Sequence, residues 1–234
     1  MKGSKITAAA KAAFPHTIPI LTGFLFVGAA YGILVRSLGF PFYAAFLMSL
    51  FVFAGAMQFV LADMLLLPFA PVSAFFATLI FNARHLFYGL SMLEKYGKLG
   101  KKKFPVIFWM CDETFSINCS VEVPEGIDKG WFYFFVSVFD YSYWIAGTTI
   151  GSIGGQFIPF DTTGIDFVMT ALFLVIFVGQ WEKEKSHISS LGGLAISLIC
   201  LVIFGSGNFI LPSMIGIILF LTLLRRPIER RITP

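Results

Sequence analysis

The chain has 234 residues, of which 57% are hydrophobic and only 13% are charged, and its mean hydropathy is +0.84. This composition excludes an ordinary soluble domain and predicts a protein of the lipid bilayer. The net charge of +4 lies in loops and tails, where attraction to anionic lipid explains it better than nucleic-acid binding does. The three cysteines form no CxxC pair, so we expect no disulfide framework, metal site or cofactor.

Eight apolar runs follow one another along the chain. They cover residues 17–35, 41–66, 71–93, 104–119, 131–151, 165–180, 188–204 and 209–224. A segment inside a bilayer must satisfy its backbone hydrogen bonds internally, and these runs lack the alternating pattern of barrel strands. The sequence therefore predicts one all-α domain over residues 1–234, a polytopic membrane helix bundle.

The positions of lysine and arginine distinguish two topologies, because basic loops favour the cytoplasmic side. If all eight runs cross, Arg36 and the lysines of residues 94–103 lie outside. If residues 104–119 instead enter without crossing, as a buried half-helix, about seven transmembrane helices remain. Only the three lysines before residue 12 then lie outside. We therefore expect the arrangement with seven crossings.

A possible internal repeat agrees with seven crossings. A GxxxG motif at Gly28 is followed by Gln58, and a second GxxxG motif at Gly147 is followed by Gln180. Seven crossings would orient these units oppositely, as in the inverted repeats of secondary transporters. Chance similarity between glycine-rich stretches is the alternative. The repeat units would cover residues 17–94 and 131–205.

Residues 51–59 are a candidate helix break. Their small residues allow close backbone approach, and Gln58 could bond the backbone groups that a break sets free. A tight helix crossing is the alternative explanation for the same residues. Breaks of this kind lie near the substrate sites of transporters, so Gln58 is a candidate substrate residue.

Charged residues inside two apolar runs are the strongest indication of function, because intramembrane charges normally face a protein interior or an aqueous cavity. Asn82 and His85 share one helix face, and Arg84 offers a planar fork that suits a carboxylate. Pairing of Arg84 with Asp112 or Glu113, or snorkelling to the interface, is the alternative. His85 could carry a proton or simply bond a neighbouring helix.

Asp112 and Glu113 point in different directions on a helix. One could bind an ammonium group or a proton while the other pairs with Arg84 or His85. A further polar and aromatic patch begins at Asp140, and we expect it at the membrane interface rather than in a cavity.

Three motifs together resemble the AzlC family. They are Ala-Gly-Ala-Met-Gln-Phe at residues 54–59, Phe-Asn-Ala-Arg-His-Leu-Phe-Tyr at residues 81–88 and Cys-Asp-Glu-Thr-Phe at residues 111–115. The resemblance implies the large subunit of a branched-chain amino acid exporter in the bacterial cytoplasmic membrane. It also implies a small AzlD-type membrane partner, ion or proton coupling, and leucine, isoleucine and valine as substrates, with methionine or analogues as further candidates.

We therefore expect two overlapping sets of site residues. The substrate set is Gln58, Asn82, Arg84, Asp112 and Glu113, and the proton or ion coupling set is His85, Asp112 and Glu113. A passive channel or an assembly subunit is the alternative, although no acidic ring or repeated pore motif is present. An enzyme is not expected, because the sequence has no HExxH pair and no evident nucleophile motif.

Overall fold

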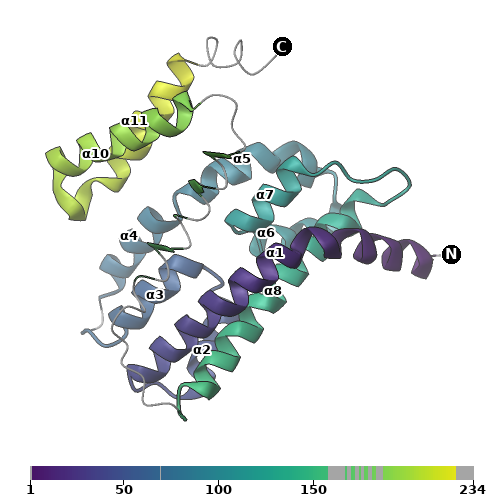
Figure 1. The fold of residues 1–234 in the computed structure, drawn as a ribbon, viewed down its shortest axis with the longest axis horizontal. Helices are drawn as coiled ribbons and strands as arrows, with labels where there is room; N and C mark the ends of the chain where they lie inside the picture. Colours follow the sequence, from purple (N-terminus) through teal and green to yellow (C-terminus); the bar gives the residue numbers. More distant parts are fainter. Residues whose placement is uncertain are drawn as a thin grey trace. The chain divides into compact units, whose positions relative to one another are not determined.

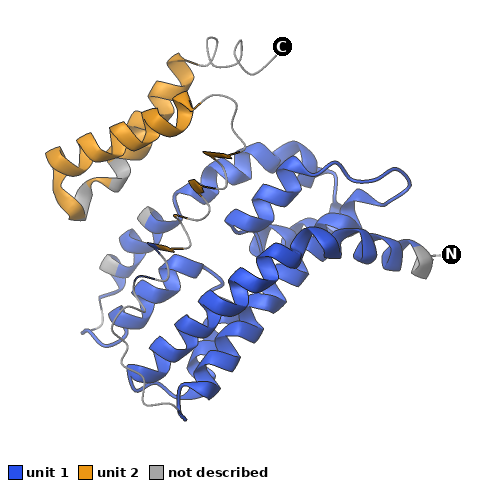
Figure 2. Cartoon of the chain, in the orientation of Figure 1, with its two compact units in different colours: residues 1–170 blue, residues 171–234 orange. Residues whose placement is uncertain are grey.

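The computed structural model is helical in the part of the chain that it describes: residues 2–68, 70–157 and 187–224, with isolated positions between 158 and 186. Contacts divide the chain into two compact units, residues 1–170 and 171–234 (Figure 2). Within the described part, Lys5–Ser37 and Ile188–Ser206 are long and apolar enough to cross a membrane. The all-α prediction is confirmed for these residues, whereas most of the run 165–180, including Gln180, lies outside them.

Helices α1 (Lys2–Ser37) and α8 (Lys129–Gly154) form the frame of the first unit and lie side by side (Figure 1). Their two GxxxG motifs meet, and glycine allows the backbones to approach closely. A Cβ atom added to Gly147 would lie 2.7 Å from the Phe24 carbonyl oxygen, and one added to Gly28 would lie 3.0 Å from the Thr148 nitrogen. Because residue numbers rise together along the contact, α1 and α8 run in the same direction.

Two pairs of short helices turn back on themselves, and we call them hairpin 1 and hairpin 2. Hairpin 1 has its tip at residues 52–54, and hairpin 2 has its tip at residues 109–111. Their helices are α2 (Phe42–Phe51) and α3 (Gly55–Met64) in hairpin 1, and α6 (Lys103–Phe108) and α7 (Asp112–Ser120) in hairpin 2.

Hairpin 1 is established by contacts on both sides of its tip. The Tyr31 hydroxyl donates to Met48 Sδ at 3.2 Å, and the Tyr31 ring lies 5.1 Å from the Phe59 ring. Gln58 Nε2 also donates to Ser49 Oγ at 3.2 Å. In one straight helix residues 48 and 59 would be about 16 Å apart, too far for one tyrosine to contact both. The predicted break within residues 51–59 is confirmed, but the expectation that residues 41–66 form one crossing is wrong.

The turn at hairpin 1 has a local cause. Phe53 has a φ of 42°, and Gly55 has a φ of 32°, so the backbone enters the left-handed region on both sides of Ala54. This conformation is costly for a side chain such as phenylalanine, and it persists only where surrounding contacts hold it. The Phe53 ring is held edge-on to the Tyr141 ring at 5.0 Å.

Helix α7 of hairpin 2 runs alongside α5 (Arg84–Gly97) in the same direction. The Tyr88 and Phe115 rings stack at 4.3 Å, and Lys95 Nζ donates to the carbonyl oxygens of Asn118 and Cys119 at 2.9 Å each. Hairpin 2 therefore begins and ends where α5 ends. The predicted single half-helix over residues 104–119 is wrong, because a break at residues 109–111 divides the run into α6 and α7. Entry into the membrane without crossing stays a prediction.

The connections show which end of the first unit each hairpin occupies. Phe42 of hairpin 1 lies at the end of α8, because Ser152 Oγ donates to its carbonyl oxygen at 3.2 Å. The base of hairpin 2 lies at the start of α8, because Lys102 Nζ is 3.4 Å from Asp128 Oδ1. Helix α4 (Pro71–Asn82) continues into α5 through Ala83, whose φ of −55° and ψ of −31° are helical.

These directions contradict the arrangement with seven crossings, which orients α1 and α8 oppositely. The described part instead has α1, hairpin 1, α4–α5 and hairpin 2 in order, and the second helix-and-hairpin pair runs opposite to the first (Figure 1). An inverted arrangement is thus present within residues 2–120. The repeat units predicted at 17–94 and 131–205 extend beyond the described ranges and stay a prediction.

The second unit contains an antiparallel helix pair, α10 (Ile188–Asn208) and α11 (Ile210–Leu223). Gly192 lies against Phe220 and Gly216 lies against Ile196. The pair corresponds to the last two predicted apolar runs. Gly205, with a φ of 72°, interrupts the helical backbone near the end of α10.

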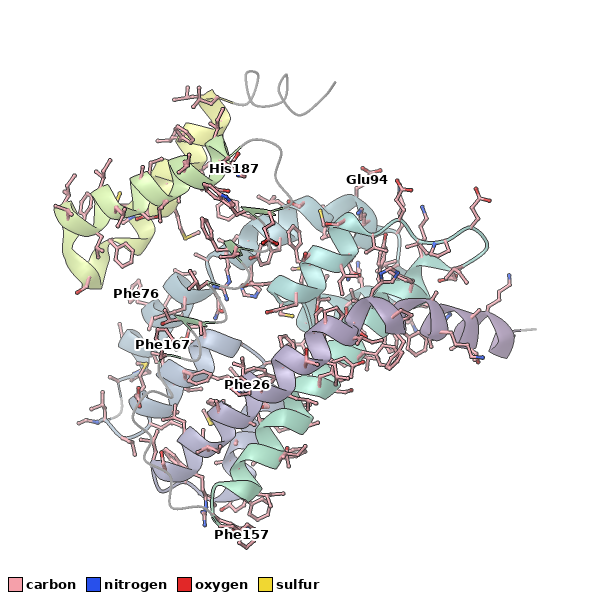
Figure 3. The ribbon with its side chains drawn as sticks, viewed as in Figure 1. Phe26, Phe76, Glu94, Phe157, Phe167 and His187 are labelled. Atoms are coloured by element: carbon pink, nitrogen blue, oxygen red, sulfur yellow. The ribbon has the colours of Figure 1, made fainter. Side chains whose placement is uncertain are left out.

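Large apolar side chains point outward from the described helices. Phe26, Phe76 and Phe157, labelled in Figure 3, are 69%, 55% and 75% exposed. Many exposed apolar side chains of this size are typical of contact with a partner or with a membrane. A surrounding bilayer accounts for it, because lipid tails accept such side chains without penalty.

The start of α8 is fixed by a polar cap outside the membrane helices. The Trp131 N–H donates to Asp128 Oδ1 at 2.8 Å. This hydrogen bond, and secondarily the Lys102 ammonium, holds the pKa of the Asp128 carboxyl below its usual range. The cap therefore stabilises the fold above the usual carboxyl range, and its contribution is lost as the pH falls through the lowered pKa.

We expect Asp128→Ala to destabilise the detergent-solubilised protein by about 1 kcal/mol at neutral pH, because it removes the cap from α8. Asp128→Asn should lose much less stability than Asp128→Ala, since asparagine caps a helix equally well. Thermal unfolding at neutral pH and near pH 3 checks this, because the deficit of the alanine variant should shrink in acid. Equal stability of Asp128→Ala and the wild type at neutral pH would contradict it.

Candidate functional site

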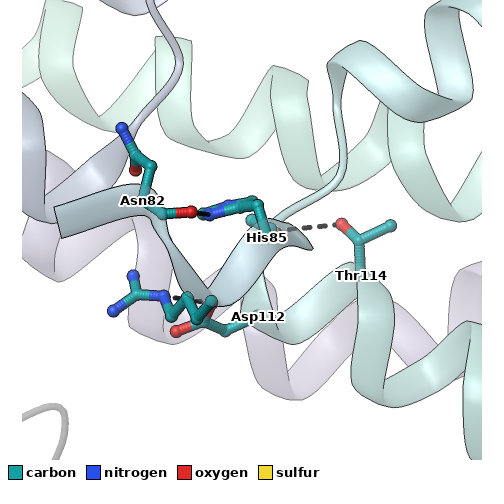
Figure 4. Close-up of polar contacts among 6 residues, drawn as sticks. Asn82, His85, Asp112 and Thr114 are labelled. Carbon is teal, nitrogen blue, oxygen red and sulfur yellow. Dashed lines mark hydrogen bonds and ion pairs between the residues drawn. The ribbon is translucent and has the colours of Figure 1, made fainter. Parts of the chain in front are cut away.

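The candidate site lies where the α4–α5 junction meets the start of α7. Arg84 Nε is 2.9 Å from Asp112 Oδ1, and the two side chains are 34% and 23% exposed (Figure 4). The structure therefore contains the pairing of Arg84 with an acidic residue, which was one of the alternatives in the sequence analysis. The pair is partly buried, so it keeps both charges inside an apolar unit while leaving them accessible to a small ligand.

His85 and Asn82 are also joined at this junction, but through the backbone. His85 Nδ1 lies 3.2 Å from the Asn82 carbonyl oxygen (Figure 4). The contact occupies a carbonyl group at the end of α4, where helical hydrogen bonding is interrupted. The His85 ring is also edge-on to the Tyr88 ring at 5.5 Å. This favours a helix-joining role for His85, and its predicted role in coupling is left as a prediction.

Asp112 and Glu113 occupy the first turn of α7. Carboxylates at a helix N-terminus are stabilised by the helix dipole, which explains locally why two acidic residues follow the tip of hairpin 2. Only Asp112 makes an ion pair with Arg84 among the ion pairs of the described residues. The sequence prediction that the two carboxylates do not act as a pair agrees with this division.

Gln58 is placed differently from the other predicted residues, because it holds hairpin 1 together. Its side chain is fully buried. Gln58 Oε1 accepts from the Ala54 backbone N–H at 3.2 Å and from Trp144 Nε1 at 2.9 Å, while Nε2 donates to Ser49. The expected bonding of freed backbone groups is confirmed. These contacts favour a positioning role for Gln58, and direct substrate binding is untested.

The middle of α8 contacts both hairpins, which the sequence prediction missed. The Tyr141 hydroxyl donates to the Leu50 carbonyl oxygen at 2.6 Å, and the Tyr141 ring stacks on Trp109 at 5.0 Å. Asp140 accepts from Thr114 Oγ1 at 2.8 Å. Tyr141 thus lies between the two hairpin tips.

The preferred interface location for the patch at Asp140 is wrong, because Asp140 is 0% and Trp144 is 3% exposed. A signal for burial was present in the sequence. Asp140, Trp144, Gly147 and Gly151 follow a four-three-four spacing, which places them on one helix face. Since the glycines mark the close contact with α1, the aspartate shares the packed face.

An apolar groove of about 730 Å³ begins beside the site. It follows α5 and α6 from His85 to Lys103, and its wall includes Leu86, Leu90, Met92, Tyr96, Ile107 and Met110. A second groove of about 520 Å³, lined by Lys95, Lys98, Lys102 and Lys129 as well as Glu94 and Asp128, lies near the base of hairpin 2. No group of three or more His, Cys, Asp or Glu side chains among the described residues is placed to hold a metal ion.

Long apolar helices, two broken-helix hairpins and an ion pair between the α4–α5 junction and hairpin 2 are typical of a helical membrane transport protein. The AzlC protein family profile matches residues 19–158. The chain belongs to the AzlC family.

Similar proteins span nearly the whole chain. It is 55% identical to the branched-chain amino acid transport protein AzlC of Bacillus subtilis, over 98% of this chain and 90% of that protein. It is 47% identical to a membrane protein of Haemophilus influenzae, over 97% and 93% of the two chains. It is 38% identical to a membrane protein of Helicobacter pylori, over 94% of this chain and 96% of that protein. No solved structure matches the chain.

Proposed function

We propose that this protein is the large subunit of a multi-pass exporter of branched-chain amino acids in a bacterial cytoplasmic membrane. It works with a small AzlD-type membrane subunit and is driven by an ion or proton gradient. The AzlC relative of Bacillus subtilis, named as a branched-chain amino acid transport protein, supports the substrate class. The geometry must then offer sites for a carboxylate, an ammonium group and an aliphatic side chain.

The observation that carries the proposal is the partly exposed Arg84–Asp112 ion pair. His85, the residue after Arg84, lines one end of the apolar groove. The Arg84 guanidinium binds the substrate carboxylate, and Asp112 or Glu113 binds the ammonium group. Asn82 lies at the same junction and supplies a polar contact. The apolar groove takes the aliphatic side chain, which favours leucine-like over polar amino acids.

Membrane orientation follows from the two hairpins. If both hairpins enter without crossing and the apolar run 165–180 crosses, six crossings place the two chain ends on the same side. Of the lysines and arginines outside the bilayer, Arg36 is then the only one left outside the cell. This distribution fits the positive-inside preference better than either arrangement expected from the sequence alone. The basic groove at the base of hairpin 2 faces the cytoplasm.

Cysteine labelling separates this topology from both earlier arrangements. We expect Lys5→Cys and Lys101→Cys to react only from the cytoplasmic side and Ser37→Cys only from outside, in a variant without native cysteines. Membrane-impermeant maleimide on intact and opened cells is the measurement. The arrangements with seven and eight crossings both place positions 5 and 101 on opposite sides, so reaction from opposite sides would exclude six crossings.

The test of function is efflux of preloaded radiolabelled leucine from cells that make this protein with and without the small partner. We expect faster efflux with both subunits, and its loss in the Asp112→Ala/Glu113→Ala variant at equal membrane abundance. Glycine and glutamate, preloaded separately, control for substrate class. No efflux of any branched-chain amino acid under either condition would reject the proposal.

A further inference from the structure

Asp140 is a buried carboxyl group that the proposed substrate site does not use. It lies near the middle of α8, and its side chain is fully buried. Thr114 Oγ1 donates to Asp140 Oδ2 at 2.8 Å, and Asp140 Oδ1 has no hydrogen-bond partner among the described residues. An ionised carboxylate buried with one hydrogen bond and no cation is strongly unfavourable, whereas the neutral acid is tolerated.

The surroundings of Asp140 also favour the neutral acid. The titratable groups that act on it from hairpin 2 are Glu113 and Cys111, which carry negative charge when ionised. Arg84, the cation of the candidate site, is paired with Asp112. On the facing stretch of α1 the contacts are apolar or hydroxyl, with Phe14 against Phe139 and Thr17 against Tyr143.

Asp140 is connected to the tip of hairpin 2 through two side chains. Thr114 donates its single hydroxyl hydrogen to Asp140, so the contact of 3.1 Å between Cys111 Sγ and Thr114 Oγ1 is a hydrogen bond donated by the thiol. Cys111 precedes Asp112, which holds Arg84. A change of charge on Asp140 therefore acts on the same half-helix that carries the proposed substrate contacts.

We propose that Asp140 is the proton-binding residue that couples transport to the proton gradient, an inference that rests on the proposed export function. The structure represents the protonated state, in which hairpin 2 is closed over α8. Loss of the proton leaves a buried charge, which favours movement of hairpin 2 away from α8 so that water reaches the carboxylate. One proton enters from outside and leaves to the cytoplasm as one amino acid moves outward.

Asp140 fits this role better than the three coupling residues expected from the sequence. Asp112 is engaged by Arg84, and the His85 ring is bonded to a backbone carbonyl. Glu113 lies in the first turn of α7 and is only partly buried, so water reaches it more readily than it reaches Asp140. Asp140 alone among these acidic residues is fully buried.

The test compares Asp140→Asn with wild type in proteoliposomes that contain both subunits. Two rates are measured: leucine exchange at equal pH on both sides, and net leucine transport driven by a pH gradient. We expect the variant to keep exchange within about twofold and to lose gradient-driven transport by at least about tenfold, since the amide preserves the Thr114 hydrogen bond but cannot lose a proton. Asp63→Asn, at an exposed position of α3, is the control and should keep both rates.

Several outcomes separate this inference from the proposed function. Gradient-driven transport at the wild-type rate in Asp140→Asn would overturn it. If folded Asp140→Asn protein also loses leucine exchange, the inference is overturned, because Asp140 would then have a structural role or bind substrate. If wild type exchanges no leucine, the proposed function fails. The proton site is then judged by infrared pH-difference spectra of purified protein, in which the carboxyl band must be present in wild type and absent in Asp140→Asn.

Discussion

Gly151→Ala should leave almost no folded protein in the membrane. A Cβ atom at Gly151 would overlap the backbone of Ala29 on α1, and backbone cannot rotate aside as a side chain can. The two helices would have to separate along the contact that holds the first unit together. Overpacking of a well-packed core costs about 1 to 3 kcal/mol of stability. We expect a cost near the upper end of this range, because the added Cβ atom of α8 meets backbone atoms of α1.

The matched control is Gly154→Ala, one turn further along α8. An added Cβ there meets nothing within 4 Å, so this variant should be as abundant and as thermally stable as wild type. Membrane abundance and size-exclusion profiles in detergent are the measurements. Similar behaviour of the two variants would mean that α1 and α8 do not meet through these glycines.

Arg84→Ala should lower leucine efflux by roughly 10-fold to 100-fold without removing the protein from the membrane. The change removes the proposed carboxylate contact, and a hydrogen bond to a charged group contributes about 1.5 to 3 kcal/mol, which corresponds to roughly a 10-fold to 100-fold loss. Arg84→Lys keeps the charge without the planar fork and should retain partial activity. Lys98→Ala removes an exposed ion pair with Glu94 at the far end of α5 and should have no effect.

A double variant distinguishes substrate binding by Arg84 from a purely structural pair. If Arg84 only neutralises Asp112, then Arg84→Ala/Asp112→Ala should recover transport, because no unpaired charge remains. If the two residues bind opposite ends of the amino acid, the double variant stays inactive. Efflux at the wild-type rate in Arg84→Ala would remove this residue from the site.

The positions of the helix breaks were easier to predict from the sequence than the direction in which the chain continues after each break. Residues 104–119 form a run too short for a usual crossing and contain two acidic residues, so entry without crossing could be predicted. Residues 41–66 are long enough to cross, and Gln58 indicated a break but not a reversal. The reversal depends on contacts of Tyr31 and Trp144, which lie far away in the sequence.

The charged part of the site was likewise easier to predict than the buried part. Charges in apolar runs require partners, so the pairing of Arg84 with an acidic residue was among the expected alternatives. Asp140 was assigned to the interface because tyrosine and tryptophan beside a charge are typical of a membrane boundary. Its burial depends on how α8 packs against α1 and hairpin 2, and local composition does not determine this packing.

The contact between glycines on α1 and α8 also divides the first unit into parts of unequal rigidity. Two backbones in direct contact have no side-chain layer that could rearrange, so α1 and α8 act as a fixed support. Hairpin 1 contacts this support through the hydrogen bonds of Gln58 with Trp144 and of Tyr141 with Leu50. Hairpin 2 contacts it through the hydrogen bond of Thr114 with Asp140 and the stacking of Trp109 on Tyr141. These few polar links can break and re-form one at a time. Amide hydrogens should therefore exchange most slowly at the glycine contact and faster at the hairpin tips.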